Sequence, residues 1–389
     1  MADATMPIGF LISTLVPAGF TALALWPRPT KGPRATPAFV LETTFNELPF
    51  VIVYWLAAST LLAVAQGRID SPIGWAGVAV ALLTAIGVAL VVRRATRARP
   101  ALDGALGSGL GIRWRDELDQ PLGRELRPNI ARWPALIAPV RLPARGVHRM
   151  RNIAYGPDGT YQRLDLYRPR SDEQRSPALI YFHPGGFFSG RKSREARPLF
   201  DRLVRLGWVC AGANYRLGRG GAFPGNLADA KRAVAWLREH AADYGADPGT
   251  IFVAGGSAGA HLAVMCALTP NDPTFQPGFE WADTSVAAAV GLYGYYGPAP
   301  TNEPMPSAPA DYARPGAPPV LVIHGSRDPM VPPGNAREFV GRLRRVSRSP
   351  VVYAELPGAQ HNFDRFPSIR FAAVIDAVEA FTAWVRSTR

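Results

Sequence analysis

The chain has 389 residues, which is enough for one large α/β domain and an additional region. Apolar residues make up 48% of the chain, and this content excludes a largely disordered protein. The formal charge of +13 comes mainly from scattered arginines, and no dense basic run is interleaved with aromatic residues, so we expect no nucleic-acid partner. Cys210 and Cys266 lie in apolar stretches and are interpreted as core residues, which excludes a disulfide framework.

Three uncharged apolar segments occupy the first quarter of the chain, at residues 8–26, 48–66 and 72–92. Each holds about 20 residues, and at roughly 1.5 Å per helical residue such a segment spans a hydrocarbon core of about 30 Å. Trp26 and Trp75 lie near segment ends, where aromatic rings are common at the membrane surface. Residues 1–97 are therefore predicted to be a transmembrane region of three helices.

Basic residues in the loops predict an orientation. The residues before the first segment include no basic residue, and the loop between the second and third segments has only Arg68, beside Asp70. Basic residues are frequent after the first segment and after the third: Arg28, Lys31 and Arg34, and then Arg93, Arg94, Arg97 and Arg99. Under the positive-inside rule, this pattern places everything after Arg93 in the cytoplasm. We expect a multi-pass protein of the cell (inner) membrane, in contact with membrane lipids, with its catalytic domain in the cytoplasm.

Residues 98–146 are interpreted as a connector. Glycines at positions 104, 107, 109 and 111 predict flexibility, and apolar residues lie between arginines over 132–142. Two interpretations of the second part stay open. It is either a plain linker or a segment that lies on lipid headgroups or covers the mouth of the catalytic domain.

From residue 147 to residue 389 the pattern changes to alternating strands and helices. Strands are expected over 148–155, 162–167, 178–182, 208–213, 251–254, 286–292, 320–323 and 351–356, and helices over 194–206, 227–244, 258–268, 335–346 and 371–385. The first two strands are expected to pair antiparallel. The alternation predicts an α/β fold, a mostly parallel sheet with helices on both faces. Ligands of such sheets bind at the carboxyl ends of the strands.

Ser257 lies in the sequence Gly255-Gly-Ser-Ala-Gly259, between an apolar strand and an apolar helix. A G-x-S-x-G motif in this context predicts a sharp, strained turn with the serine hydroxyl exposed. Gly255 and Gly259 lack a Cβ, so neighbouring backbone can pass close to them. The amide of Ala258 opens the helix and is free to face developing negative charge.

Two further strand ends carry candidate partners for Ser257. Asp328 follows the strand at 320–323, and His361 follows the strand at 351–356. A serine hydroxyl needs an imidazole to take its proton, and the imidazole needs a carboxylate to fix its tautomer. The order serine, aspartate, histidine along the chain is that of α/β-hydrolases. Asp229 is a competing acid, but it lies on a helix before the serine and is disfavoured.

A glycine pair at the end of the strand at 178–182 predicts the oxyanion site. The amides of Gly185 and Gly186, with the amide of Ala258, are expected to bind the negative oxygen of a tetrahedral intermediate. The proline-rich loop over 298–319 is expected to border the pocket. Tyr293, Tyr295 and Tyr296 precede it and are interpreted either as pocket-lining residues or as core or surface aromatics.

Several of these stretches together resemble the hormone-sensitive-lipase-like esterases of the α/β-hydrolase superfamily: HPGGF at 183–187, NYRL at 214–217, GGSAGAHLA at 255–263, HGSRDPMVP at 324–332 and GAQHNF at 358–363. The resemblance covers residues 147–389 and implies an α/β-hydrolase fold in which His183 orders the oxyanion loop. The family usually has a third glycine and an aspartate where this chain has Pro184 and Asn214. Three membrane helices before such a domain are also similar to a subset of membrane-anchored bacterial esterases.

The expected activity is hydrolysis of a small-molecule or lipid carboxylic ester through an acyl-enzyme, without a metal or an organic cofactor. In this scheme Ser257 attacks the carbonyl carbon, His361 acts as base and then as acid, and Asp328 orients His361. Two alternatives stay open. The same triad serves amidases, arylformamidases and acyltransferases, and the serine motif is also similar to the arylformamidase-like branch. A more remote alternative is a non-catalytic receptor on a hydrolase scaffold.

Overall fold

A computed structural model describes residues 8–28, 37–119, 122, 126, 146–159, 161–170 and 175–389. The stretch over 132–142 that was considered as a pocket cover lies outside the described residues, as do Lys31 and Arg34 of the first loop.

The sheet has eight strands in the order β1-β2-β4-β3-β5-β6-β7-β8. Their bounds are Val147–Ala154 for β1, Arg163–Pro169 for β2, Ser176–Phe182 for β3, Val209–Ala213 for β4, Ala246–Gly256 for β5, Ala288–Leu292 for β6, Val320–Gly325 for β7 and Val351–Leu356 for β8. β2 pairs antiparallel with both β1 and β4, and every other neighbouring pair is parallel. The predicted mostly parallel sheet is confirmed, and its central strands are apolar because both faces are covered.

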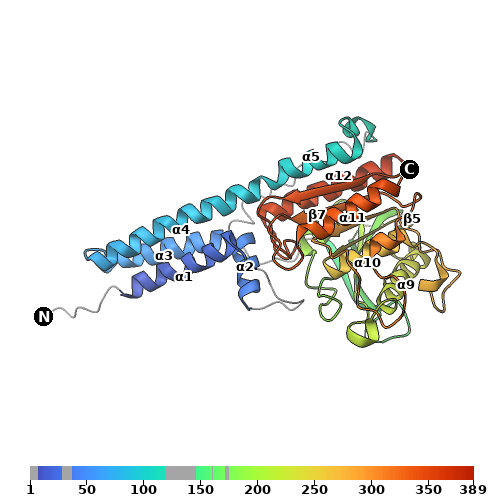
Figure 1. The fold of residues 1–389 in the computed structure, drawn as a ribbon, viewed down its shortest axis with the longest axis horizontal. Helices are drawn as coiled ribbons and strands as arrows, with labels where there is room; N and C mark the ends of the chain where they lie inside the picture. Colours follow the sequence, from blue (N-terminus) through green and yellow to red (C-terminus); the bar gives the residue numbers. More distant parts are fainter. Residues whose placement is uncertain are drawn as a thin grey trace.

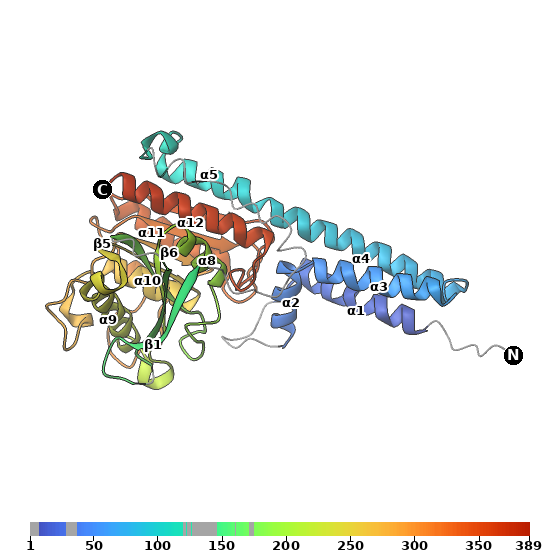
Figure 2. The same cartoon turned by 180° about the vertical axis from the view of Figure 1, so that it is seen from behind.

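Helices cover the two faces in separate groups (Figures 1 and 2). On one face lie α9, α10 and α11, and on the other lie α8, α12 and α5. Their bounds are Arg197–Arg205 for α8, Gly225–Glu239 for α9, Ala258–Leu268 for α10, Pro333–Val346 for α11, Ile369–Ser387 for α12 and Ala98–Leu110 for α5. Every residue of α10 is buried, which suits a helix that is apolar on all sides. Short 3-10 turns, η1 to η5, lie at Trp114–Glu117, Gly218–Gly221, Ala242–Tyr244, Pro273–Phe275 and Pro309–Tyr312.

The N-terminal helices α1, α3 and α4 form a bundle that projects from the sheet domain, and α2 lies at the junction (Figures 1 and 2). These helices span Ile8–Leu25, Pro37–Glu47, Phe50–Ala65 and Pro72–Thr96 for α1 to α4. Large apolar side chains are exposed along the bundle, among them Ile12, Leu15, Trp55, Leu61, Leu62, Trp75, Leu82, Leu83 and Ile86.

Length and composition make two of the helices candidates to cross a membrane, α1 and the continuous helix Pro72–Leu110. The segment over 48–66, which was also expected to span the membrane, does not qualify as a membrane-spanning helix by itself. Its helix α3 has 16 residues, and it qualifies only together with α2, to which it is bent by 87°. The prediction did not include α2 itself, because this stretch was interpreted as loop.

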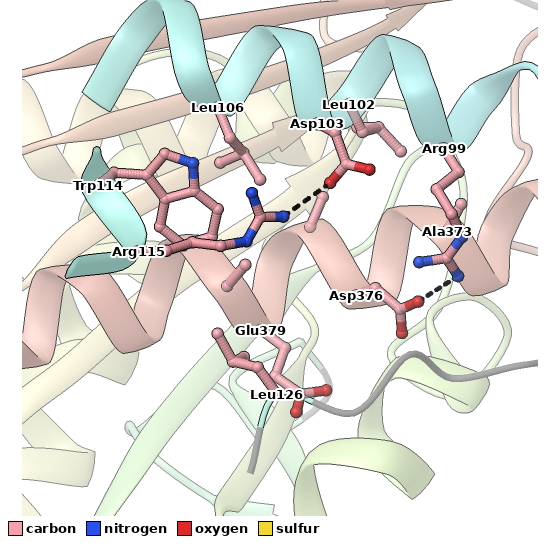
Figure 3. A pocket seen from close by; sticks show the side chains of 12 residues that line it. Arg99, Leu102, Asp103, Leu106, Trp114, Arg115, Leu126, Ala373, Asp376 and Glu379 are labelled. Carbon is pink, nitrogen blue, oxygen red and sulfur yellow. Dashed lines mark hydrogen bonds and ion pairs between the residues drawn. The ribbon is translucent and has the colours of Figure 1, made fainter. Parts of the chain in front are cut away.

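The prediction that glycines make residues 98–110 flexible is wrong, because they form helix α5, which continues from α4. Leu102, Leu106 and Leu110 recur every four residues and are buried against the domain. A buried apolar face outweighs the low helix propensity of glycine. Figure 3 shows α5 beside α12, with the ion pairs Arg99–Asp376 and Asp103–Arg115 at a cavity of about 100 Å³ between them.

Candidate active site

Ser257 lies at the sharp turn between β5 and α10, as the motif predicts. Its backbone has φ 52° and ψ −117°, a conformation that is strained for a residue with a side chain. A Cβ on Gly255 would lie 2.2 Å from the backbone of Gly259, and a Cβ on Gly259 would lie 2.0 Å from the carbonyl oxygen of Phe182. Both glycines are therefore required by close backbone contacts, which confirms that expectation.

Asp328 and His361 are in direct contact. His361 Nδ1 lies 2.6 Å from Asp328 Oδ2, and the amides of Met330 and Val331 each donate to Asp328 Oδ1 at 2.9 Å. His324 Nε2 lies 3.4 Å from the same Oδ2 atom. Burial alone raises the pKa of Asp328, but the neighbouring His361 and His324 outweigh it and hold the pKa below its ordinary value. The carboxylate is thus kept in the charged form that orients an imidazole.

The second nitrogen of His361 is free to receive a proton. Because Nδ1 donates to Asp328, Nε2 is the accepting atom, and it is buried without a hydrogen-bond partner among the described residues. No hydrogen bond joins it to Ser257 within the described part of the chain, although such bonds are often long in enzymes without substrate. Tyr293, after β6, contacts the His361 ring at 4.7 Å between centroids, and the Tyr295 amide donates to the Ser257 carbonyl at 3.3 Å.

A cavity of about 310 Å³ opens at Ser257. It is lined by Gly186, Phe187, Phe188, Ser257, Ala258, Tyr295, Pro298, Pro300, Met330 and Val331. Apolar side chains dominate this lining, and among the described residues that form it the polar groups are the serine hydroxyl, the Tyr295 hydroxyl and backbone groups. The cavity therefore suits an apolar group attached to a carbonyl at Ser257.

Two of the three expected oxyanion donors lie at this cavity. Gly186 and Ala258 line it together with Ser257, and their amides donate to no other described residue. Gly185 does not line the cavity. Its φ is +141°, and a Cβ there would lie 1.8 Å from the carbonyl oxygen of Ser189, so this glycine is needed to shape the loop.

His183 packs beneath the oxyanion loop. Its ring stacks on Tyr215 at 4.4 Å, its Nδ1 lies 2.9 Å from the Pro184 carbonyl oxygen, and burial lowers its pKa to about 4. The Tyr215 hydroxyl donates to the His183 carbonyl at 2.7 Å. At the other departure from the family pattern, Asn214 Oδ1 accepts from the Lys192 amide at 2.7 Å. The contacts of His183 with Tyr215 and Pro184 are those of a histidine with a structural role.

The competing candidates are engaged elsewhere. Asp229 accepts from Arg216 and Gln162, so it is not the partner of His361. His261 is fully buried, and its ring meets Phe187 edge-on at 5.4 Å. Among the described residues, no group of three or more side chains is arranged to hold a metal ion.

Asp364 was missed by sequence reasoning. Its carboxylate accepts hydrogen bonds from the hydroxyls of Tyr181 and Tyr293, and all three groups are buried. A Cβ on Gly256 would lie 2.2 Å from the Tyr293 hydroxyl, so the cluster lies directly behind the turn at Ser257. The available signal was an acidic residue three positions after His361, combined with tyrosines at two strand ends.

Comparisons with known proteins agree with this architecture. The family model BD-FAE matches residues 164–303. The chain is 36% identical to the probable carboxylic ester hydrolase LipM of Mycobacterium tuberculosis over 98% of this chain and 94% of LipM, and 38% identical to the esterase LipQ of the same organism over 76% of each.

A solved structure of Thermogutta terrifontis esterase 2 is 26% identical, covers 62% of this chain and 95% of its own, and has a TM-score of 0.54. The same esterase is also known in a form phosphoramylated by tabun, with a TM-score of 0.52. The alternative of a non-catalytic receptor on a hydrolase scaffold is thereby set aside, because LipM and LipQ, which match most of this chain, are described as ester hydrolases. The chain belongs to the carboxylesterases of the α/β-hydrolase family and is a carboxylic ester hydrolase.

Proposed function

We propose that the protein is a membrane-anchored serine esterase that works through the triad Ser257, Asp328 and His361. The observation that carries the proposal is the 2.6 Å contact between His361 Nδ1 and Asp328 Oδ2. It leaves Nε2 as a free base at the sheet edge where the strained turn presents Ser257.

The reaction has two halves with the same groups. Ser257 Oγ attacks the ester carbonyl carbon while its proton passes to His361 Nε2, and the oxyanion is bound by the amides of Gly186 and Ala258. The intermediate then collapses, the alcohol leaves with the proton from His361, and an acyl-serine remains. Water then attacks the acyl-serine carbonyl while giving a proton to His361, and collapse of this intermediate releases the carboxylic acid as His361 returns the proton to Ser257 Oγ. Each oxyanion donor contributes roughly 10²–10³ in kcat.

Apolar substrates suit the site. The cavity of about 310 Å³ is at the lower end of ordinary ligand pockets, roughly 300–1,000 Å³, and it is walled by Phe187, Tyr295 and Val331. A small-molecule or lipid ester with an apolar acyl group fits this description.

Membrane anchoring rests on the outer surface and the charges of the N-terminal helices. We propose a transmembrane region over residues 1–97 with three spans, a connector over 98–146 and a cytoplasmic catalytic domain over 147–389. The exposed apolar side chains of the bundle favour lipid around it, and Arg93 and Arg94 at the end of α4 favour a cytoplasmic position for the catalytic domain. Reporter fusions after residue 100 test this orientation. Activity of a periplasm-only reporter at that position would contradict it.

Active-site labelling and hydrolysis test the catalytic proposal. Full-length protein in detergent is expected to hydrolyse p-nitrophenyl esters of graded chain length and to be labelled by a fluorophosphonate at Ser257, as the tabun adduct of the Thermogutta esterase suggests. Ser257→Ala is expected to lose about 10⁶ in kcat. Labelling elsewhere, or an active Ser257→Ala variant, would refute the triad. Matched ester and amide substrates, with and without an alcohol acceptor, separate hydrolysis of esters from amidase, arylformamidase or acyltransferase activity.

A further inference from the structure

The last turn of α1 contacts the residues that directly precede the proposed catalytic acid and base. Arg327 donates to the carbonyl of Leu25, and Gln360 Nε2 donates to the carbonyl of Ala24 at 3.2 Å. Arg94 of α4 also donates to the Leu25 carbonyl, at 3.2 Å. The last carbonyls of a helix lack partners within it, so these side chains satisfy groups that would otherwise be unpaired. Both catalytic loops are thereby tied to one helix end.

Helix α2 contacts the loop over residues 357–368, which carries His361 and is called the histidine loop, and the start of α12 that follows it. Asn46 Nδ2 donates to the Gly358 carbonyl at 3.3 Å, before the histidine. After it, Glu47 accepts from the Ser368 hydroxyl and forms an ion pair with Arg370. Arg370 is fully buried and Glu47 is 5% exposed. Separating the partners of a buried ion pair would leave an uncompensated buried charge, so this contact opposes movement of the segment at residues 368–370 away from α2.

The same helix also reaches the imidazole. Phe39, two turns before Asn46 on the buried face of α2, is 1% exposed, and its ring lies 6.2 Å from the ring of His361 between centroids. Within the described part of the chain, Tyr293 also contacts this imidazole, at 4.7 Å between ring centroids. The imidazole is thus flanked by one ring from the sheet domain and one from the N-terminal helices.

We propose that α2 is a positioning element of the catalytic centre and that Phe39 is a positioning residue for His361. The N-terminal helices then complete the active site in addition to anchoring it. This inference rests on the proposed role of His361 as general base. Proton transfer requires the imidazole to keep its place between the serine and the leaving group, and a displacement of about 1 Å can cost about 10²-fold in rate.

Substitutions on α2 in the full-length protein test the proposal. Phe39→Ala is expected to lower kcat about 10-fold with KM changed less than about twofold, because it misplaces the base without altering the acyl cavity. The rate of fluorophosphonate labelling should fall by the same factor. Phe39→Leu, which keeps apolar volume against His361, is expected to restore most of kcat. Asn46→Ala, which removes the hydrogen bond to the Gly358 carbonyl and a local one to Glu47 Oε1, should lower kcat up to about fivefold.

Leu41→Ala is the matched control, because Leu41 lies on the exposed side of the same helix. It is expected to keep the parent kcat. A parent-like kcat in both Phe39→Ala and Asn46→Ala overturns the proposal, and so does an equal loss in Leu41→Ala, which would indicate a general loosening of α2. The Ser257→Ala variant separates a failure of the proposed catalytic triad from a failure of the proposed role of α2. An enzyme that needs Ser257 but keeps the parent kcat in both Phe39→Ala and Asn46→Ala refutes only the role of α2, whereas an enzyme that does not need Ser257 refutes both proposals.

Discussion

The turn at Ser257 is packed by neighbouring strands of the sheet domain, whereas the loop that carries His361 is also held by residues from the other end of the chain. The turn at Ser257 is shaped by Gly255 and Gly259 and by the backbone of the adjacent strand β3. The histidine loop instead accepts a hydrogen bond at the Gly358 carbonyl from Asn46, 312 positions away, and donates one from Gln360 to the Ala24 carbonyl, 336 positions away.

The difference teaches which parts of the site a short motif can specify. A strained turn needs only small residues at fixed positions, since the backbone itself makes the close contacts. A loop that must carry a base has no such local solution, because the imidazole is oriented by side chains on separate elements. Asp328, Tyr293 and Phe39 come from three different parts of the chain.

After Ser257→Ala, the largest expected effect falls on the histidine side. Asp328→Asn should lower kcat about 10⁴-fold, because an amide can favour the wrong imidazole tautomer and provides no charge for the imidazolium. Steady-state hydrolysis of a p-nitrophenyl ester measures it, and the exposed Asp311→Asn is the control. Retention of a large part of the parent kcat in Asp328→Asn would show that the 2.6 Å contact is not part of the catalytic machinery.

The turn at Ser257 is expected to respond in stability. Gly259→Ala places a Cβ 2.0 Å from the Phe182 carbonyl, and strand β3 must move, at a cost of about 3 kcal/mol. Gly220→Ala is the control, since a Cβ at Gly220 meets nothing within 4 Å. Denaturant unfolding of both variants in detergent measures the free energy of unfolding. Equal stability of the two variants would mean that the turn is not as close-packed as described.

The same contrast explains what the sequence could predict. The strand order along the chain, the turn at Ser257 and the pairing of Asp328 with His361 follow from apolar periodicity and from local motifs. Helix α2 was missed because Glu42, Asn46 and Glu47 make it polar within an apolar region, and its buried polar face makes sense only beside the histidine loop. The helical form of residues 98–110 was missed because glycines were weighed above the spacing of leucines that pack on α12.

The oxyanion site was only partly predictable for a related reason. Glycines at 185 and 186 indicate a loop with unusual dihedrals, but which amide faces the cavity depends on how the loop packs against Ser189 and His183. Sequence spacing does not contain that information. Gly186 lines the cavity, and a side chain at Gly185 would meet the Ser189 carbonyl.

A buried carboxyl behind the site predicts a dependence of stability on pH. Burial raises the pKa of Glu195 to about 7, with Asp364 adding to the rise and Arg194 opposing it. Because the folded protein then holds a proton that the unfolded chain releases near its ordinary value of 4.5, stability is highest below that pH and falls as the pH rises through about 7. The loss amounts to roughly 3 kcal/mol.

Glu195→Gln should remove this slope. Thermal unfolding at pH 5 and at pH 8 is the measurement, and the difference in Tm between the two conditions should shrink in the variant. Glu338→Gln, on the exposed side of α11, should keep the parent difference. An unchanged slope in Glu195→Gln would assign the pH dependence to other groups.

Asp364, together with Tyr293, offers the smallest effects and the most direct test of coupling between the two regions. Its carboxylate joins the Tyr181 and Tyr293 hydroxyls behind Gly256 and lies in the loop that carries His361. Asp364→Asn should lower kcat about 10-fold at nearly constant KM, since an amide offers one accepting oxygen where the carboxylate offers two.

Tyr293→Phe should have a milder effect, about fivefold, because it removes one of the two hydrogen bonds. Residues of one hydrogen-bond network are not independent, so the double variant should lose less in kcat than the product of the two single losses. Full multiplicative loss would mean that the hydroxyl of Tyr293 and the carboxylate of Asp364 act separately. The turn at Ser257 and the loop of His361 would then be held as independent parts, each by its own contacts.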